Sequence, residues 1–416
     1  MSEPAARVEG AWLGSRQIRR LFAVFPPGTV RCVGGCVRDS LAALPVKDVD
    51  LATSLLPDEL VARLERAGIA VVPTGLRHGT VTAVVDHHPF EVTTLRRDVE
   101  TDGRHARVAF TDDWHADAAR RDLTINAIYC DPDGRLFDPF GGADDLRAGR
   151  VRFVGDPRER IREDYLRLLR FFRFLARFGR GEPDAAALAA CRELAPGMAR
   201  LSAERVHDEI LKLLGGPRVP ETVALMAATG VLAHANPGFA AVDRLARLVA
   251  AEEVAERRLG LRPDAIRRLA ALLRPGDPAA LDRLRLSNRE RARIEAIHRP
   301  QPVMTPTRDP VRRRQLIHDL GVKCYRDRCL VGWADDPAPD VEGWLEMLAE
   351  ADRWTPPEFP LAGRDVLALG VPSGPAVGAL LGQVHRWWRD GGFTADRAAC
   401  LARLEELAAE RSGTAV

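Results

Sequence analysis

Alternating apolar and polar residues mark the first third of the chain. Short runs rich in Val and Thr, bounded by Gly, Pro or Asp, are typical of strands. Such runs are TVRCVGG (29–35), DVDLATS (48–54), IAVVPTG (69–75), GTVTAVVD (79–86) and FEVTTLR (90–96). The segment PDELVARLERAG (57–68) has helical spacing and ends at a glycine, which predicts a helix between the second and third strands. We therefore expect mixed strand and helix from about residue 30 to 140.

From about residue 145 onward the strand pattern is lost. Ala, Leu, Arg and Glu dominate, and apolar residues recur at helical spacing. Proline and glycine separate predicted helices at 275–286, 305–321 and 337–354. The pattern predicts an α+β head followed by a long all-α portion. Because 416 residues are too many for one core, we expect two to four domains.

Asp48 and Asp50 are separated by one residue at the start of the second predicted strand. On a strand this spacing places both side chains on one face. Two neighbouring carboxylates repel unless a positive charge lies between them, and a pair of divalent metal ions meets that need in phosphoryl transfer. Magnesium suits hard carboxylate oxygens. A solvated strand end explains the same spacing, so the pair alone does not decide.

A glycine pair, Gly34-Gly35, closes the first predicted strand and opens a helix. Glycine lets backbone N–H groups approach a phosphate, and a helix N-terminus favours an anion. Arg38 in the first turn can donate two hydrogen bonds to phosphate oxygens. Together with Asp48 and Asp50, all within seventeen residues, these features predict a nucleoside triphosphate held against two metal ions. Glu91 is the candidate third carboxylate, although an exposed strand position explains it equally well.

The second informative stretch is RERIREDYLRLLRFFRFLARF (158–178), which we predict to form one amphipathic helix. Its apolar positions fall on one arc, and four polar residues follow at intervals of three along the other side, namely Asp164, Arg167, Arg170 and Arg173. Cytosine and adenine each present an amino donor beside a ring-nitrogen acceptor, whereas uracil and guanine present the opposite order. Asp164 can accept from the amino group while Arg167 donates to the ring nitrogen. A mismatched base would then leave polar groups unpaired at about 1–3 kcal/mol each. A solvated arginine stripe is the alternative.

Charge and cysteine content add less. The net charge of +2 hides an uneven distribution. Residues 30–149 are acidic, with 20 acidic against 14 basic residues. Two segments are basic: 150–180, with ten Arg against four acids, and 285–330, with twelve Lys/Arg against five acids. This split suits a metal site and a polyanion at different places. However, only three residues are lysine, as base-composition bias would also produce. Seven scattered cysteines without Cys-x-x-Cys, no apolar run of about eighteen residues and no secretory signal predict a cytoplasmic protein without a membrane segment.

These motifs, in this order, resemble the bacterial class II tRNA nucleotidyltransferases, which are the CCA-adding enzymes and their relatives the bacterial poly(A) polymerases. The resemblance covers about 30–180 and is carried by GGCVRD, DVD, TGLRHGTVTAVVD, FEVTTLRRD, RRDLTINAIYCD, DPFGGADDLRAGRVRFVGDP and RIREDYLRLLRFFRF. It is weaker beyond 215. It implies a nucleotidyltransferase head with a mixed β-sheet at 1–145, a neck with base-recognition helices at 146–215, an RNA-binding helical body at 216–330 and an RNA-binding helical tail at 331–416.

The resemblance also implies residue roles. The metal ligands would be Asp48 and Asp50, with Glu91 the third catalytic carboxylate. The nucleotide-binding residues would be Gly34, Gly35 and Arg38 at the triphosphate, Arg121, Asp122 and Asn126 at the phosphates and ribose, Asp164 and Arg167 at the base, and Arg170 and Arg173 at phosphates or bracing Asp164. Residues 97–115 would form a flexible loop needed when specificity changes from C to A. An inert surface loop explains that segment equally well.

The implied activity is template-independent addition of the 3′-terminal CCA to tRNA with CTP, ATP and Mg²⁺. The RNA 3′-hydroxyl attacks the α-phosphorus and pyrophosphate leaves, with catalysis by positioning and charge neutralisation. The helical remainder would bind the acceptor arm and 3′ end of the tRNA through shape and phosphate contacts. Trp333, Trp344, Trp387 and Trp388 are expected in the core rather than as base-stacking platforms.

Three alternatives differ in chemistry. A poly(A) polymerase would share the fold and metal site, and partial addition of C or A alone also fits. A non-catalytic RNA-binding relative would lack a carboxylate, yet both aspartates are present. A hydrolase built on His-Asp pairs is not predicted, because His207-Asp208 and His318-Asp319 lack further ligands at helical spacing. The oligomeric state stays open.

Overall fold

The computed structural model describes residues 7–102 and 105–413. In the described part, a mixed sheet has the strand order β3-β4-β5-β2-β1-β8-β9, in which β2 and β5 are parallel and the other neighbours are antiparallel. This confirms the predicted α+β head with a mixed sheet. The strands are β1 (Val30–Val33), β2 (Leu51–Thr53), β3 (Ala70–Gly75), β4 (Thr80–Val85), β5 (His88–Thr94), β8 (Tyr129–Cys130) and β9 (Leu136–Phe137).

The hydrophobic core of the head lies between this sheet and two helices, α1 (Arg16–Phe22) and α3 (Pro57–Arg66). Leu60 and Leu64 lie one helical turn apart on α3, which contacts β3 and β4, and both side chains are fully buried. In β4 every second residue is buried, as the alternating sequence predicts. The alternation of apolar and polar residues in the sequence thus correctly predicted which side chains of β4 face the core.

Asp48 and Asp50 lie just before β2 rather than within a strand over 48–54. The reason is that β1 ends at Val33, whose N–H donates to the Asp50 carbonyl at 2.9 Å, and the chain then turns at Gly34. No residue of β1 remains to pair with Asp48. The argument that a regular strand places both side chains on one face therefore does not apply, because β2 begins only at Leu51.

Within 97–115, predicted as a loop, the described residues include a β-hairpin instead. Its strands β6 (Arg96–Asp102) and β7 (His105–Phe110) pair antiparallel as a separate two-stranded sheet, with a register shift between Asp98 and Glu100. Helix α4 (Trp114–Ala119) follows, beginning after the capping residue Asp113, whose carboxylate accepts from the His115 N–H. That the segment is mobile remains a prediction.

The stretch 158–178 is two helices, α6 (Pro157–Glu163) and α7 (Leu166–Phe178), and not the single helix predicted. Asp164 interrupts them with φ −155° and ψ 107°, and its carboxylate accepts from the Leu166 N–H at 3.1 Å. Aspartate favours such local capping over a helix interior. The apolar arc nevertheless faces the core, since Ile161, Leu168 and Phe172 are fully buried.

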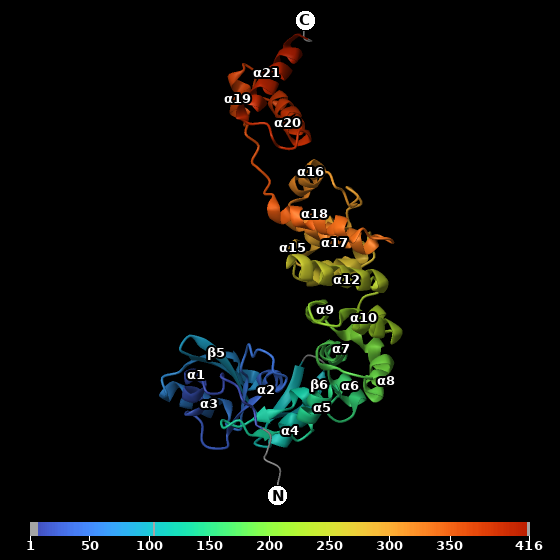
Figure 1. Ribbon diagram of the computed structural model, residues 1–416. Coiled ribbons are helices and arrows are strands. Elements are labelled where there is room, and N and C mark those ends of the chain that lie inside the picture. The colour runs from blue at the N-terminus through green and yellow to red at the C-terminus, as the bar shows by residue number, and fades with distance from the viewer. Residues whose placement is uncertain (1–6, 103–104, 414–416) are drawn as a thin grey trace. The chain divides into compact units, whose positions relative to one another are not determined.

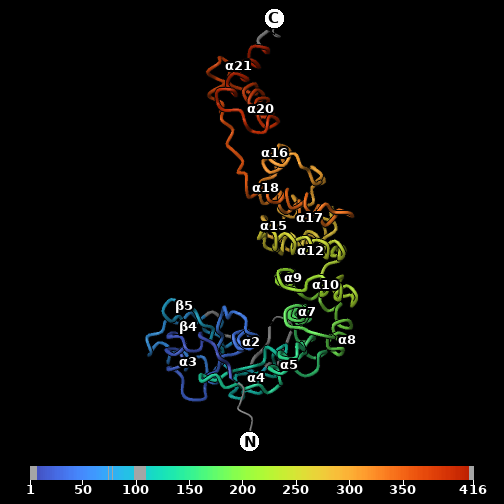
Figure 2. The backbone as a smooth tube through the Cα atoms, viewed as in Figure 1, coloured from blue at the N-terminus to red at the C-terminus, as the bar shows by residue number. Residues whose placement is uncertain are grey.

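Beyond residue 145 the described chain is helical, as predicted (Figures 1 and 2). The other helices of the chain are α2 (Gly35–Leu41), α5 (Gly142–Ala148), α8 (Ala185–Leu194), α9 (Ala203–Leu214), α10 (Val219–Ala228), α11 (Val231–Ala235), α12 (Val242–Leu259), α13 (Ala265–Leu272), α14 (Pro278–Asp282), α15 (Asn288–His298), α16 (Pro310–Leu320), α17 (Val322–Asp335), α18 (Val341–Arg353), α19 (Gly363–Ala368), α20 (Pro375–Asp390) and α21 (Arg397–Gly413), with short 3₁₀ turns η1 (Leu76–His78), η2 (Thr124–Asn126) and η3 (Ala195–Arg200).

The chain divides into two compact units. The first comprises Met1–Val242 with Asp277–Leu286, and the second comprises Asp243–Gly276 with Ser287–Val416. The finer boundaries at 145, 215 and 330 stay predictions. Within the described residues, no helix is long and apolar enough to cross a membrane.

Tryptophans of the second unit are mostly core residues, as predicted. The side chains of Trp333, Trp344 and Trp388 are buried, whereas Trp387 is 40% exposed and does not fit that expectation. Trp387 neighbours Trp388 on α20, and its side chain therefore points away from the face that Trp388 buries.

Candidate active site

A cleft of about 320 Å³ in the first unit gathers most of the predicted site residues. It lies where the turn after β1, the ends of β2 and β5, and the segment from α4 to η2 meet, with α7 on one side. The predicted residues that line it are Gly34, Gly35, Arg38, Asp50, Glu91, Arg121, Asp122, Asn126 and Arg170. Residues from five separate stretches of sequence are thus brought to one place.

Two of the three predicted metal-site carboxylates, those of Asp50 and Glu91, line this cleft. Burial raises the pKa of the Asp50 carboxyl above its ordinary range, and the nearby negative charges of Glu91 and Asp48 raise it further, while Arg121 opposes them. Asp48 and Asp50 are both exposed at the surface, and only Asp50 lines the cleft. On β5, Glu91 is exposed while Phe90 and Val92 are buried, as its strand alternation predicts.

These oxygen donors suit a hard divalent cation, which would relieve the repulsion that raises the Asp50 pKa. Across residues 7–102 and 105–413, no three His, Cys, Asp or Glu side chains are gathered closely enough to form a metal cage by themselves. Protein sites for magnesium usually supply one or two carboxylates, and substrate phosphates complete the coordination of the ion. The donor set therefore fits the expected metal.

The glycine turn places backbone N–H groups at the cleft. Gly34 has φ +70° and ψ −115°, a conformation that only glycine adopts readily. Its own N–H donates to the Ile128 carbonyl at 3.1 Å. Helix α2 starts directly at Gly35, so that the first free N–H groups of the helix follow the turn.

Arg38 is buried rather than freely extended. Its guanidinium donates to Asp39 at 2.8 Å and to the Asn126 side-chain oxygen at 2.5 Å, and it stacks on the rings of Phe174 and Phe178. Burial lowers the pKa of Arg38, and Asp39 counteracts the effect. Because the Arg38 guanidinium is buried, water screens its charge only weakly, and its attraction for a phosphate is correspondingly strong.

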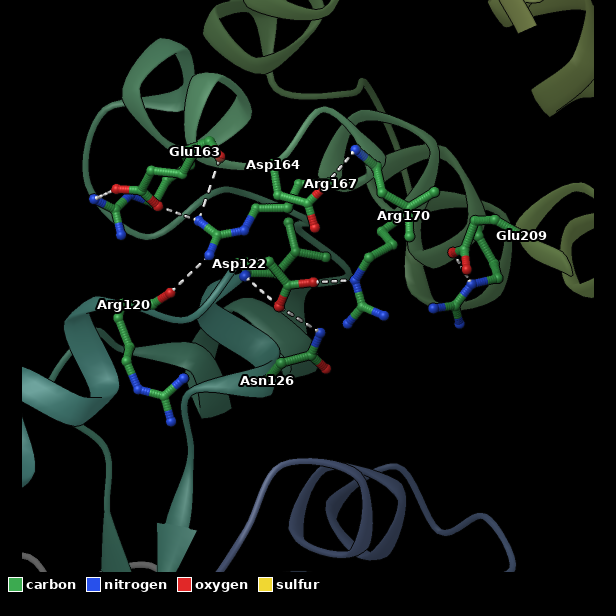
Figure 3. A network of polar contacts seen from close by, with 12 residues as sticks. Arg120, Asp122, Asn126, Glu163, Asp164, Arg167, Arg170 and Glu209 are labelled. Carbon is green, nitrogen blue, oxygen red and sulfur yellow. Dashed lines mark hydrogen bonds and ion pairs between the residues drawn. The ribbon is translucent and has the colours of Figure 1, made fainter. Parts of the chain in front are cut away.

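Asn126, which binds Arg38, is also part of a polar network with Asp122 and Arg170 (Figure 3). The Asn126 amide donates to Asp122 at 3.1 Å, and Arg170 donates to the other oxygen of Asp122 at 2.6 Å. Burial alone would raise the pKa of Asp122, but Arg170 and Asn126 hold it below its ordinary range. Asp122 is therefore a fixed anion that orients Arg170 and Asn126.

A second cleft of about 250 Å³ adjoins the first, because Arg121, Asp122 and Arg170 line both. Asp164 and Arg167 line this second cleft together, which places the predicted base-recognition pair beside the predicted phosphate site. We expected Asp164 and Arg167 to project freely from one helix. Instead, Asp164 precedes α7, and both side chains form ion pairs with other residues.

Each member of that pair has its own support. Asp164 forms an ion pair with Arg205 at 2.7 Å, and Arg167 donates to Glu163 at 2.5 Å and to the Arg120 carbonyl at 3.0 Å (Figure 3). The direct partner of Asp164 is thus Arg205 of α9, whereas Arg170 interacts with Asp164 through charge without a direct hydrogen bond. Bracing of Asp164 by Arg170 or Arg173 stays a prediction.

Arg173 lies outside both clefts. It forms an ion pair with the buried Glu209 of α9 and stacks on the ring of Phe174. A spacing of three residues carries it about 60° around the helix axis from the line of Arg170. Its expected contact with nucleotide phosphates is not supported by this position.

Several residues at the clefts escaped the sequence analysis. Glu163, adjacent to Asp164, could have been found as an acidic partner at i,i+4 from Arg167. Arg120 immediately precedes Arg121 and lines both clefts. Arg205 lies 41 residues after Asp164, and no local pattern in the sequence points to it.

Comparison with known proteins decides the family. Residues 30–152 match the model of the poly A polymerase head domain, and residues 182–242 match that of the probable RNA and SrmB-binding site of polymerase A. The mouse mitochondrial CCA tRNA nucleotidyltransferase 1 is 36% identical over 402 residues, which cover 94% of this chain and 90% of that protein. The chain belongs to the CCA tRNA nucleotidyltransferase family.

Other members of the family agree with this assignment. The CCA-adding enzyme of Geobacillus stearothermophilus is 40% identical over 222 residues, covering 53% of each chain. The crystal structure of the Bacillus stearothermophilus CCA-adding enzyme in complex with CTP matches at 30% identity with a TM-score of 0.75, covering 97% of this chain and 98% of that one. The Thermotoga maritima enzyme complexed with tRNA_CCA has a TM-score of 0.67 at 19% identity, which supports the fold.

Proposed function

We propose that this nucleotidyltransferase adds the 3′-terminal CCA to tRNA from CTP and ATP without a nucleic-acid template. The observation that carries the proposal is the pair of adjoining clefts, one with the carboxylates and glycine turn, the other with Asp164 and Arg167. A nucleotide spanning them would present its triphosphate to the first and its base to the second. The named relatives favour this activity over a poly(A) polymerase.

Base selection would rest on fixed hydrogen-bond groups. The Asp164 carboxylate accepts from the amino group of cytosine or adenine, and Arg167 donates to the ring nitrogen next to it. Because Arg205 and Glu163 hold these side chains, neither can rotate freely to suit a uracil or guanine edge. Polar groups left unpaired by the wrong base would cost about 1–3 kcal/mol each.

The triphosphate would lie along the glycine turn and the arginines. Gly34 and Gly35 allow close approach of backbone N–H groups, while Arg38 and Arg121 supply positive charge. Members of this family use a divalent metal, and Asp48, Asp50 and Glu91 would hold Mg²⁺. When bound, the ion would neutralise phosphate charge and favour ionisation of the RNA 3′-hydroxyl. The residues of the chain hold the α-phosphorus in line for attack by that hydroxyl, with pyrophosphate as leaving group.

The RNA partner would be a tRNA acceptor arm with an incomplete 3′ end, bound in part by arginine-rich helices between 285 and 330. That the protein itself is cytoplasmic stays a prediction, which rests on its cysteine usage.

The test uses tRNA that lacks its 3′ end and each labelled triphosphate in turn. We expect CTP alone to add two nucleotides, ATP to add one only after them, and the product to stop at CCA. A long A tail would show a poly(A) polymerase, and C or A addition alone would show a partial activity. The Asp48→Ala/Asp50→Ala double variant is the matched control, because it keeps the base-recognition cleft and should transfer nothing. Transfer by that variant at the wild-type rate would contradict the proposed site.

A further inference from the structure

Asp117 of α4 is a buried carboxylate outside both clefts. It is 1% exposed, and it lines neither the carboxylate cleft nor the base cleft. An ionised group so buried costs several kcal/mol unless it is fully paired. Its partners therefore indicate why the fold retains it.

One carboxylate oxygen of Asp117 binds two neighbours of the cleft. It accepts from the Arg120 guanidinium, with Nε at 2.8 Å and Nη2 at 2.7 Å, and from the backbone N–H of Arg96 at 3.2 Å. Arg96 is the first residue of the β6–β7 hairpin, and it lines the carboxylate cleft. The start of the hairpin and Arg120 are thus tied to the same atom.

The other oxygen of Asp117 binds the opposite side of the network. It accepts from the Tyr129 hydroxyl at 2.6 Å and from Arg121 at 3.3 Å, and Arg121 Nε donates in turn to the Tyr129 oxygen at 2.9 Å. Arg121 is the cleft arginine whose charge acts on Asp50. Although burial alone would raise the pKa of Asp117, Arg120, Arg121 and Tyr129 keep it below its ordinary range, so the carboxyl is ionised at neutral pH.

The network reaches the base cleft through Arg120. The Arg120 carbonyl accepts from Arg167, so the position of Arg120 also determines where the guanidinium of Arg167 lies. Three arginines that line the carboxylate cleft, namely residues 96, 120 and 121, converge on one carboxylate that does not line it.

We infer that Asp117 is a positioning residue for nucleotide binding and base selection, acting through Arg121 at the phosphates and through Arg120 on Arg167. This inference rests on the proposed function for the nature of the ligand. It requires that the loss of the Asp117 charge loosens phosphate binding and base discrimination together, although Asp117 touches neither.

The test compares Asp117→Asn and Tyr129→Phe with Asp144→Asn, a control in the same unit that loses an exposed ion pair to Arg147. Calorimetry measures the Kd for CTP, and single-turnover kinetics measure the ratio of CTP to UTP incorporation. For Asp117→Asn we expect the Kd to rise about 10-fold to 100-fold, as for loss of hydrogen bonds to charged groups, and the ratio to fall. For Tyr129→Phe, which keeps the charge, we expect a rise of about 3-fold to 10-fold.

A purely structural role predicts a different result. Activity would fall only with the folded fraction, measured by circular dichroism, while the Kd of the folded protein and the CTP to UTP ratio stayed at the values of Asp144→Asn. That outcome would overturn the inference. If Asp117→Asn does not fold, the Kd of Tyr129→Phe decides. A wild-type protein that binds CTP but transfers nothing to tRNA would refute the proposed function, and the Kd values would still test the positioning role.

Discussion

At the scale of single residues, the support of Arg167 is the sharpest feature of the base cleft. Glu163, the last residue of α6, pairs with the guanidinium of Arg167 on α7 at 2.5 Å. Glu163→Gln removes this charge but keeps the side-chain volume, so we expect kcat/KM to fall about 10-fold for both CTP and ATP, since a hydrogen bond to a charged group is weakened. The control is Glu159→Gln, an exposed position on the same helix α6. Equal steady-state kinetics for the two variants would contradict a role for Glu163 at the base.

The two glycines of the turn should differ in the property that they control. Gly34 has a positive φ, so Gly34→Ala should lower the free energy of unfolding by about 1–3 kcal/mol. Gly35 starts α2 with no strained φ, and a Cβ there would meet only Arg38 Nη2, at 3.9 Å. We therefore expect Gly35→Ala to retain stability and to weaken only CTP binding. Urea unfolding measures the first effect and calorimetry the second, and equal stability losses in both variants would refute the distinction.

At the scale of elements, the sequence predicted strands well and their ends poorly. The strands β1 to β4 fall within the predicted runs of Val and Thr, and β5 overlaps its run but begins two residues earlier, because burial of alternate residues leaves a local period. The break at Asp164 was missed because a helical period continues across it, and one side chain-to-backbone bond decides the local conformation. The candidate site was found where motifs are local, as with Gly34 and Asp50. Arg205 was missed because its partner Asp164 lies 41 residues away in sequence. Asp117 was missed although Arg120 and Arg121 follow it at i+3 and i+4, because that spacing does not reveal burial.

The contact between α16 and α20 should depend on pH. The His385 ring lies 5.2 Å from that of His318 and 5.8 Å from that of Trp388. Burial lowers the pKa of His385, and the positive charges of His318 and Arg389 lower it further, although Asp319 opposes them. The folded state thus disfavours the protonated ring. The stability that neutral His385 contributes is present above its unfolded pKa of about 6.5 and is lost progressively as the pH falls toward the lowered pKa.

Tryptophan fluorescence during urea unfolding can measure this dependence. Between pH 7.5 and pH 5.5 we expect the second unit to lose stability in the wild type and to lose less in His385→Gln, which cannot be protonated. His234→Gln serves as the control, because His234 is exposed and lies in the first unit. An identical pH dependence in wild type and His385→Gln would show that this contact is not the cause.

At the scale of the whole molecule, the sequence revealed the change from mixed to helical structure but not the division into units. Helix α14 belongs to the first unit, although more than thirty residues of the second precede it. The Asn236 amide donates to the Ala280 carbonyl at 2.9 Å and is buried by this contact. The packing of α14 with the first unit depends on contacts between residues far apart in the sequence, and a local hydrophobic pattern does not predict such contacts.

The second unit contains a buried network of ion pairs. We expect this network to affect the stability of the second unit and not that of the first. Glu252 of α12 is 1% exposed and pairs with Arg268 at 2.6 Å and Arg267 at 3.0 Å, both on α13. Asp327 of α17 lies 3.8 Å from Arg267 and pairs with Arg293 of α15 at 2.8 Å. The network therefore joins four helices, and removal of the Glu252 charge takes a buried counter-charge from Arg267 and Arg268.

We expect Glu252→Gln to lower the free energy of unfolding of the second unit by about 3–5 kcal/mol, the usual cost of breaking a buried ion pair. The nucleotide clefts lie wholly in the first unit, so the Kd for CTP should not change. Transfer to tRNA should nevertheless fall if the second unit binds the RNA, because less of that unit is folded at the assay temperature. Glu253→Gln, at the adjacent exposed position, is the matched control. A weakened Kd for CTP in Glu252→Gln would show that the two units do not act separately in nucleotide binding.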